Sequence, residues 1–178
     1  MIDPITAKTV TVLVVEDHEI TRVGLTLTLK RSSEIEIVGE ASDGKQAVEL
    51  AVSLQPNVVL MDIGLPIIDG IEATGQIKKG VSGARIIMLT AHDNDREIFA
   101  ALGAGADGYC LKGTATAQLV LAIKTVADGA AWLDPGIATK VLQASVLAGL
   151  PAANKASEDA ATKVPGPGPR LSQREVDV

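Results

Sequence analysis

Hydrophobic and polar positions along the first 130 residues form two kinds of segment that follow one another in turn. Short apolar runs rich in β-branched residues are typical of strands buried on both faces. Longer stretches, in which apolar residues recur every three or four positions, are typical of helices with one buried face. The expected strands cover residues 9–15, 35–40, 57–61, 84–90 and 108–112. An expected helix follows each of them.

The stretch after the first strand, residues 18–32, fits two patterns. Residues 25–29 (LTLTL) alternate with period two, as a half-buried strand would. Four positions of the same stretch fall at helical spacing, namely Ile20, Val23, Gly24 and Leu27. We predict a helix, because two parallel strands need a crossover connection between them.

Five strand–helix repeats predict a parallel sheet with helices on both faces. In such sheets ligands bind outside the carboxyl ends of the strands, and this chain places polar side chains there. Glu16 and Asp17 follow the first strand, and Asp62, Thr90 and Lys112 come at the ends of the third, fourth and fifth. We therefore expect Asp62 at a strand tip in a solvated cleft, outside the core.

This set of residues suits phosphoryl chemistry. Neighbouring carboxylates raise one another's pKa unless a cation lies between them, and Mg²⁺ is a hard cation that prefers such oxygen ligands. Lys112 adds a fixed positive charge. A free carboxylate can attack phosphorus to give an acyl phosphate, while the metal and the ammonium neutralise the phosphoryl oxygens. The Thr90 hydroxyl could donate a hydrogen bond to one of those oxygens.

Four motifs in this chain resemble the receiver domain of bacterial two-component response regulators. They are VLVVEDHEI (12–20), VVLMDIGLPIIDG (58–70), MLTAHD (88–93) and GADGYCLK (105–112). The resemblance covers residues 9–130. It implies a doubly wound, flavodoxin-like, five-stranded parallel sheet with the strand order 2-1-3-4-5.

The resemblance also implies a role for each residue of the set. Asp62 would be the phosphoacceptor. Asp17 and Asp62, with the backbone carbonyl of Gly64, would ligate Mg²⁺, and Glu16 would act on the metal mainly through water. The implied phosphoryl-binding and switch residues are Thr90, Lys112 and Tyr109. A sensor histidine kinase would be the donor, and Tyr109 would swing inward when Thr90 moves toward the phosphoryl group.

The C-terminal part has a different composition. Residues 131–147 predict a connecting helix that begins near Asp134 and Pro135. Residues 148–170 are rich in Ala, Pro and Gly without periodicity, which predicts a flexible linker. Residues 171–178 (LSQREVDV) contain an S-x-x-E capping box. They resemble the start of the helix-turn-helix effector of the NarL/FixJ (LuxR-type) subgroup, so we expect a truncated DNA-binding domain.

Composition narrows the possible partners. The chain has 178 residues, of which 47% are hydrophobic, and a net charge of -6. An acidic globular chain is a poor nucleic-acid binder by itself, so we expect DNA contact only through the missing effector and a possible homodimer. The single cysteine excludes an internal disulfide. No apolar run or N-terminal signal pattern indicates a membrane span or export, which predicts a cytoplasmic protein with no membrane partner.

Two alternatives come from other functional classes. One is a hydrolase that uses Asp62 as nucleophile, in the manner of haloacid-dehalogenase-type phosphatases, whose D-x-D motif supplies a second acid. Gly64 occupies that second position here. The other is a receiver-like interaction module that no longer takes phosphate; the set Asp17, Asp62, Thr90 and Lys112 argues against it. We therefore expect no enzyme activity beyond self-phosphorylation and self-dephosphorylation.

Overall fold

A parallel sheet of six strands organises the molecule, and the computed structural model describes residues 9–91 and 94–147. The strands are β1 (Val10–Val15), β2 (Ile35–Ala41), β3 (Val58–Asp62), β4 (Arg85–Thr90), β5 (Gly108–Leu111) and β6 (Trp132–Leu133). Their order is β2-β1-β3-β4-β5-β6, with every neighbouring pair parallel. The predicted order 2-1-3-4-5 is confirmed, and the two-residue β6 is an addition that the sequence pattern did not predict.

In the part of the chain that the structure describes, six helices connect or follow these strands. They are α1 (Glu19–Leu29), α2 (Gly44–Leu54), α3 (Gly70–Gly80), α4 (Asp95–Gly103), α5 (Thr116–Ala127) and α6 (Pro135–Leu147). The side chains of Asp43, Asp69 and Asn94 accept hydrogen bonds from backbone N–H groups in the first turns of α2, α3 and α4. Local capping therefore fixes where three of the crossover helices begin.

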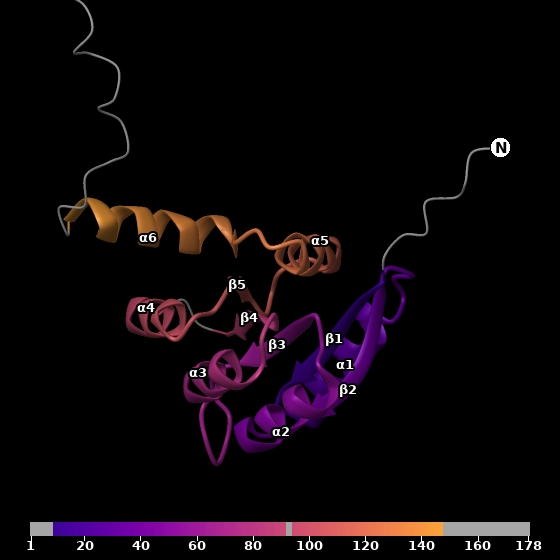
Figure 1. Ribbon diagram of the computed structural model, residues 1–178. Coiled ribbons are helices and arrows are strands. Elements are labelled where there is room, and N and C mark those ends of the chain that lie inside the picture. Colours follow the sequence, from indigo (N-terminus) through magenta and orange to yellow (C-terminus); the bar gives the residue numbers. More distant parts are fainter. Residues whose placement is uncertain (1–8, 92–93, 148–178) are drawn as a thin grey trace, which may run out of the picture. The chain divides into compact units, whose positions relative to one another are not determined.

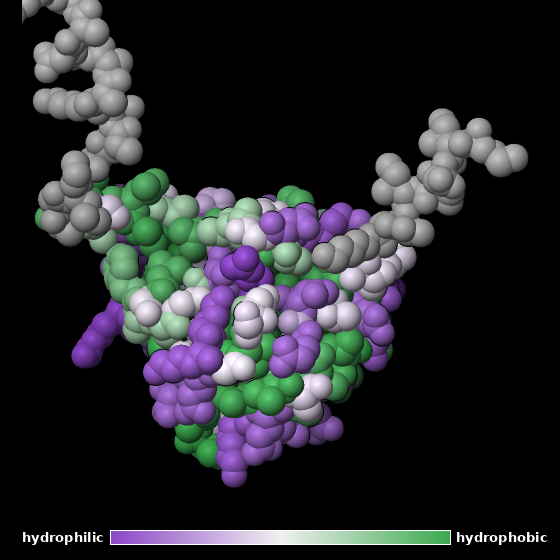
Figure 2. Space-filling model, viewed as in Figure 1, coloured by the Kyte–Doolittle hydropathy of each residue, from purple (hydrophilic) through white to green (hydrophobic). Residues whose placement is uncertain are grey.

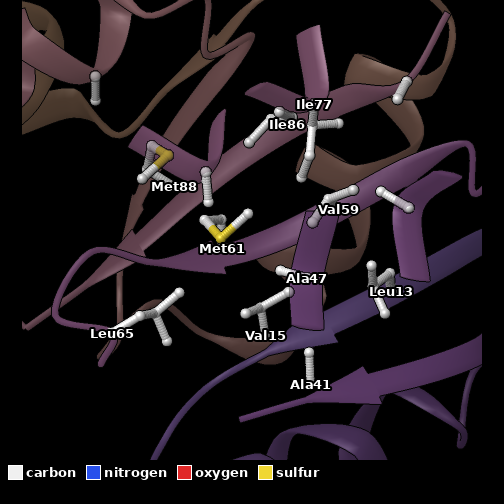
Figure 3. Packing of buried hydrophobic residues seen from close by; sticks show 14 of the residues in the cluster. Leu13, Val15, Ala41, Ala47, Val59, Met61, Leu65, Ile77, Ile86 and Met88 are labelled. Carbon is white, nitrogen blue, oxygen red and sulfur yellow. The ribbon is translucent and has the colours of Figure 1, made fainter. Parts of the chain in front are cut away.

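The sheet lies between two layers of helices, which Figure 1 shows in ribbon form. One buried cluster joins β-strand side chains to α2, α3 and α4, and also contains Ile137 of α6. A second cluster joins the other side of the sheet to α1 and α5. Figure 3 shows the first cluster, where Val59 and Met61 of β3 lie between side chains of β1 and β4. All five residues of β3 are buried; the apolar run predicted this for Val58–Met61 and did not predict it for Asp62.

Helix α1 exists as predicted, but its buried side differs from the one indicated by spacing. Ile20 is 90% exposed, and Val23 and Leu27 are also exposed. The residues that α1 buries are Thr26 and Leu29. The alternating Leu and Thr residues give this helix apolar groups on more than one side, and packing against β1 and α5 selects between them.

Strand β6 widens the sheet by one short strand, which pairs with β5. Trp132 N donates to Asp107 O (3.2 Å), and Asp134 N donates to Tyr109 O (3.1 Å). Within the segment predicted to carry the connecting helix, residues 132–133 form a strand, and α6 begins at Pro135, at the expected position. Proline suits this position, because the first turn of a helix does not need its missing N–H.

The chain divides into two compact units, Met1–Gln143 and Ala144–Val178, and the boundary falls within α6. The linker predicted at 148–170 and the helix start predicted at 171–178 lie outside the described residues. On the face shown in Figure 2, hydrophobic side chains reach the surface in patches among hydrophilic ones. Among the helices that the structure describes, none is both long and apolar enough to cross a membrane.

Candidate functional site

Lys112 connects two carboxylates at the carboxyl end of the sheet. It follows the last residue of β5, and its Nζ lies 2.9 Å from Asp62 Oδ2 and 2.7 Å from Glu16 Oε2. Burial alone would lower the pKa of Lys112, but its hydrogen bonds and charge interactions with Glu16 and Asp62 outweigh burial and raise it. Three elements that are distant in sequence, β1, β3 and β5, thus meet at one ammonium group.

Glu16 is almost fully buried directly after β1. Its side chain is 1% exposed, its backbone N–H donates to Ala41 O (3.0 Å), and its backbone oxygen accepts from Arg22 Nη1 (2.7 Å). Its second carboxylate oxygen, Oε1, accepts from His18 N (3.3 Å). A buried carboxylate is costly unless it is paired, so the ammonium of Lys112 accounts for this position.

Asp62 is the last residue of β3 and is only 7% exposed. The expectation of a solvated cleft around this carboxylate is therefore wrong. Lys112 neutralises Oδ2, and Ile63 N donates to Oδ1 (2.8 Å). Gly70, at the start of α3, approaches so closely that an added Cβ would lie 1.9 Å from Asp62 O. Glycine at position 70 therefore lets the start of α3 pack against the backbone of Asp62.

Asp17 is more exposed to solvent than Glu16 and Asp62, with its side chain 30% exposed. Its Oδ1 is 3.0 Å from His18 Nδ1. The ligand atoms of Glu16, Asp17 and His18 all lie within 4.8 Å of one another. The structure therefore places an acidic cluster at the end of β1. His18 belongs to this cluster, although its spacing in sequence did not indicate a role.

Thr90 and Tyr109 belong to β4 and β5, next to Lys112. Thr90 ends β4 one position beyond Leu89, which is paired with Asp62, and its backbone oxygen accepts from Lys112 N (2.7 Å). Tyr109 is fully buried in the same cluster as Met88 and Ile98. Its position inside the core places its ring between the sheet and the layer that contains α4.

The acidic cluster at the end of β1 suits a hard divalent cation. Glu16, Asp17 and His18 offer ligand atoms within 4.8 Å of one another, and carboxylate oxygens are the ligands that Mg²⁺ prefers. Asp62, which Lys112 contacts, lies outside this group of ligand atoms. Gly64 lies exposed two residues after Asp62, and nothing lies within 4 Å of an added Cβ there. The loop carrying its backbone carbonyl is thus uncrowded at this point.

One buried acid near these residues was not predicted from the sequence. Asp134, between β6 and α6, is 8% exposed and accepts hydrogen bonds from Leu111 N and Thr114 Oγ1. In sequence it looks like an ordinary start of a helix before proline, and only the pairing of β6 with β5 brings it beside the 111–114 segment. Its one sequence signal is the Asp-Pro pair itself.

Comparison with known proteins gives a consistent result. Residues 12–124 match the response regulator receiver domain family. The response regulator protein VraR of Staphylococcus aureus is 39% identical over 133 residues, which are 75% of this chain and 64% of VraR. The chain therefore spans less than two thirds of the length of these curated relatives.

Solved structures agree with the sequence match. A LuxR-family two-component response regulator from Aurantimonas sp. SI85-9A1 superposes with a TM-score of 0.74 at 34% identity, covering 78% of this chain and 99% of that one. The signal receiver domain of NarL from Mycobacterium tuberculosis gives a TM-score of 0.66 at 33% identity, covering 68% and 98%. Sequence and fold agree: the chain belongs to the response regulator receiver domain family, among NarL/LuxR-type relatives.

Proposed function

We propose that Asp62 of this chain accepts a phosphoryl group from a sensor histidine kinase. The observation that carries the proposal is the position of Lys112 Nζ, 2.9 Å from Asp62 Oδ2 at the carboxyl edge of the sheet. An ammonium held against a carboxylate is placed to neutralise a phosphoryl oxygen when that carboxylate becomes an acyl phosphate.

The transfer is a displacement at phosphorus. An Asp62 carboxylate oxygen forms the new P–O bond, the P–N bond of the donor phosphohistidine breaks, and its electron pair stays on the imidazole nitrogen. Lys112 and the Thr90 hydroxyl stabilise the phosphoryl oxygens. Asp17, Asp62 and the Gly64 carbonyl would hold Mg²⁺, with Glu16 acting through water; the bound metal supplies charge neutralisation.

The consequence is a shift between two conformations. Added negative charge on Asp62 draws Thr90 toward it, and Tyr109 follows, so that the balance between inactive and active states changes. A useful response requires that the phosphoryl group favour the active conformation over the inactive one by a few kcal/mol. The proposed output, in the cytoplasm, is altered homodimerisation and the control of transcription that LuxR-type relatives carry out.

A hydrolase that uses Asp62 as nucleophile is less well supported. Such an enzyme needs a second acid two residues later to act as general acid and base. Gly64 stands there and has no side chain. The protein is therefore proposed as a phosphoacceptor that turns over no small substrate, including p-nitrophenyl phosphate.

The test is phosphorylation by acetyl phosphate with Mg²⁺, followed by intact mass. We expect a gain of one phosphoryl group in the wild type, none in Asp62→Asn, and none when the divalent cation is chelated. Asp69→Asn is the matched control, since asparagine caps α3 as well as aspartate does; it should be labelled normally. Labelling that persists in Asp62→Asn would overturn the assignment.

A further inference from the structure

Asp134 is a buried carboxylate that the proposed phosphoryl transfer does not use. It lies between β6 and α6 and is 8% exposed. Oδ2 accepts hydrogen bonds from Leu111 N (2.8 Å) and Thr114 Oγ1 (2.6 Å), and Oδ1 accepts from Trp132 Nε1 (3.2 Å). A carboxylate buried to this degree needs such donors, and they come from two parts of the chain, the 111–114 segment and Trp132 of β6.

The change from strand to helix explains why a side chain, and not a backbone carbonyl, accepts the hydrogen bond from Leu111 N. Asp134 N still donates to Tyr109 O (3.1 Å), as a strand residue would. The next β5 amide, Leu111 N, would need a carbonyl from a longer β6. The chain instead turns into α6, where Ala138 N donates to Asp134 O (2.9 Å). The Asp134 carboxylate therefore takes the place of the missing strand acceptor.

These bonds lie on both sides of Lys112. Leu111 precedes Lys112, and Thr114 follows it by two residues. On the side facing β4, Lys112 N donates to Thr90 O (2.7 Å). The backbone that carries the Lys112 ammonium is thus held between β4 and Asp134, while the ammonium itself contacts Asp62.

The neighbouring thiol of Cys110 is influenced by Asp134. Burial raises the pKa of Cys110 to about 12, and the charge of Asp134 and its hydrogen bond with the thiol add to the effect. Cys110 therefore stays protonated at neutral pH.

We propose that Asp134 is a positioning residue for Lys112, and that it links the state of Asp62 to helix α6. This inference rests on the proposed function. When a phosphoryl group on Asp62 draws Lys112 toward it, the 111–114 segment moves with the ammonium, and its bonds to Asp134 transmit the movement to the start of α6. Helix α6 begins the segment that leads out of this domain.

Trp132 provides a built-in reporter, because it is the only tryptophan in the chain and donates to Asp134. The experiment compares wild type with Asp134→Asn, Thr114→Val and Thr114→Ser. Asp128→Asn is the matched control, since Asp128 is exposed at the end of α5. Each protein is titrated with beryllofluoride and Mg²⁺ while Trp132 emission is followed, and acetyl phosphate labelling is timed separately by intact mass.

We expect Trp132 emission to respond to beryllofluoride in the wild type and to respond far less in Asp134→Asn. Labelling of Asp134→Asn should slow on the order of tenfold, because a misplaced ammonium stabilises the transferring group poorly. Thr114→Val should slow labelling less, and Thr114→Ser, which keeps the hydroxyl, should restore it. Asp128→Asn should match the wild type. Wild-type labelling rates in both Asp134→Asn and Thr114→Val would overturn the inference.

Failure of the proposed function gives a different result. In that case the wild type itself takes up no phosphoryl group. The positioning role of Asp134 is then tested without any phosphoryl donor, by measuring amide hydrogen exchange in residues 109–114. Faster exchange there in Asp134→Asn, with Asp128→Asn unchanged, supports the role, and unchanged exchange refutes it.

Discussion

At the scale of single residues, Lys112 decides whether the acidic edge of the sheet is stable. Glu16 and Asp62 are both buried, and each would be costly without a cation nearby. Their shared contact with the Lys112 ammonium leaves the local charge negative, which keeps the site attractive to a divalent cation. The same residue therefore supports both folding and the proposed chemistry.

Replacing Lys112 with Met should destabilise the protein by about 2 kcal/mol at pH 7 without divalent cation, because two buried carboxylates lose their counter-charge. The pKa of Lys112 is raised in the folded state. Its contribution is therefore fully present below its ordinary value of 10.5 and is lost as pH rises through the folded value. Urea unfolding of both proteins from pH 7 to 11 should show a constant difference that shrinks only above about pH 10.5.

Lys79→Met is the control for this measurement, since Lys79 is exposed on α3. It should change the free energy of unfolding by less than about 0.5 kcal/mol. An equal loss in both variants would mean that the position near Asp62 has no special electrostatic role.

At the scale of elements, Asp107 joins one helix and two strands at the edge of the sheet opposite the site. Its carboxylate contacts Lys78 of α3 (2.6 Å) and Arg85 of β4 (3.0 Å), and accepts from Ile86 N (2.8 Å). Asp107 lies just before β5, and its side chain is 15% exposed. These contacts fix α3 and β5 against β4 at the end where the strands begin.

Asp107→Asn should lower the free energy of unfolding by about 2 kcal/mol, because two cations lose their counter-charge. Phosphorylation of Asp62 should continue at the wild-type rate, since Asp107 lies at the other end of the strands. Chemical denaturation and intact mass measure the two effects. Glu49→Gln, at an exposed surface pair, is the control and should cost less than about 0.5 kcal/mol; a large loss of labelling in Asp107→Asn would contradict this separation.

At the scale of the whole molecule, the compact unit that carries the site continues through Gln143. It includes β6 and the first turns of α6, with Ile137 fully buried in the cluster that also contains Tyr109. The resemblance to receiver domains covered residues 9–130, so it was no reason to expect that later residues belong to the folded unit.

A chain that ends after residue 143 should therefore fold and be labelled like the full chain. A chain that ends after residue 130 should lose about 3 kcal/mol or more, because it exposes the outer edge of β5 and the pocket that Ile137 fills. Thermal unfolding of the two truncated chains makes the comparison. Equal melting temperatures would show that β6 and α6 do not contribute to this unit.

Much of this fold could be predicted from pattern alone, for reasons visible in particular elements. The apolar run of β3 and the periodic face of α5, with Leu119, Ala122, Ile123 and Val126, leave few alternatives and are confirmed. Helix α1 has apolar groups on several sides, so its sequence could not tell which side would be buried. Strand β6 has two residues, too few for any period to be recognised.

The sequence by itself determined the order of strands and helices and the ends of β1, β3, β4 and β5 as the place for polar chemistry. It could do so because periodicity and chain order are local properties. Only the tertiary structure decided that Lys112 contacts both Glu16 and Asp62, that Asp62 is buried, and that Asp134 lies beside the Lys112 segment. Those facts depend on which strands become neighbours and how closely their ends pack, and distances across a sheet leave no mark on the sequence of any one strand.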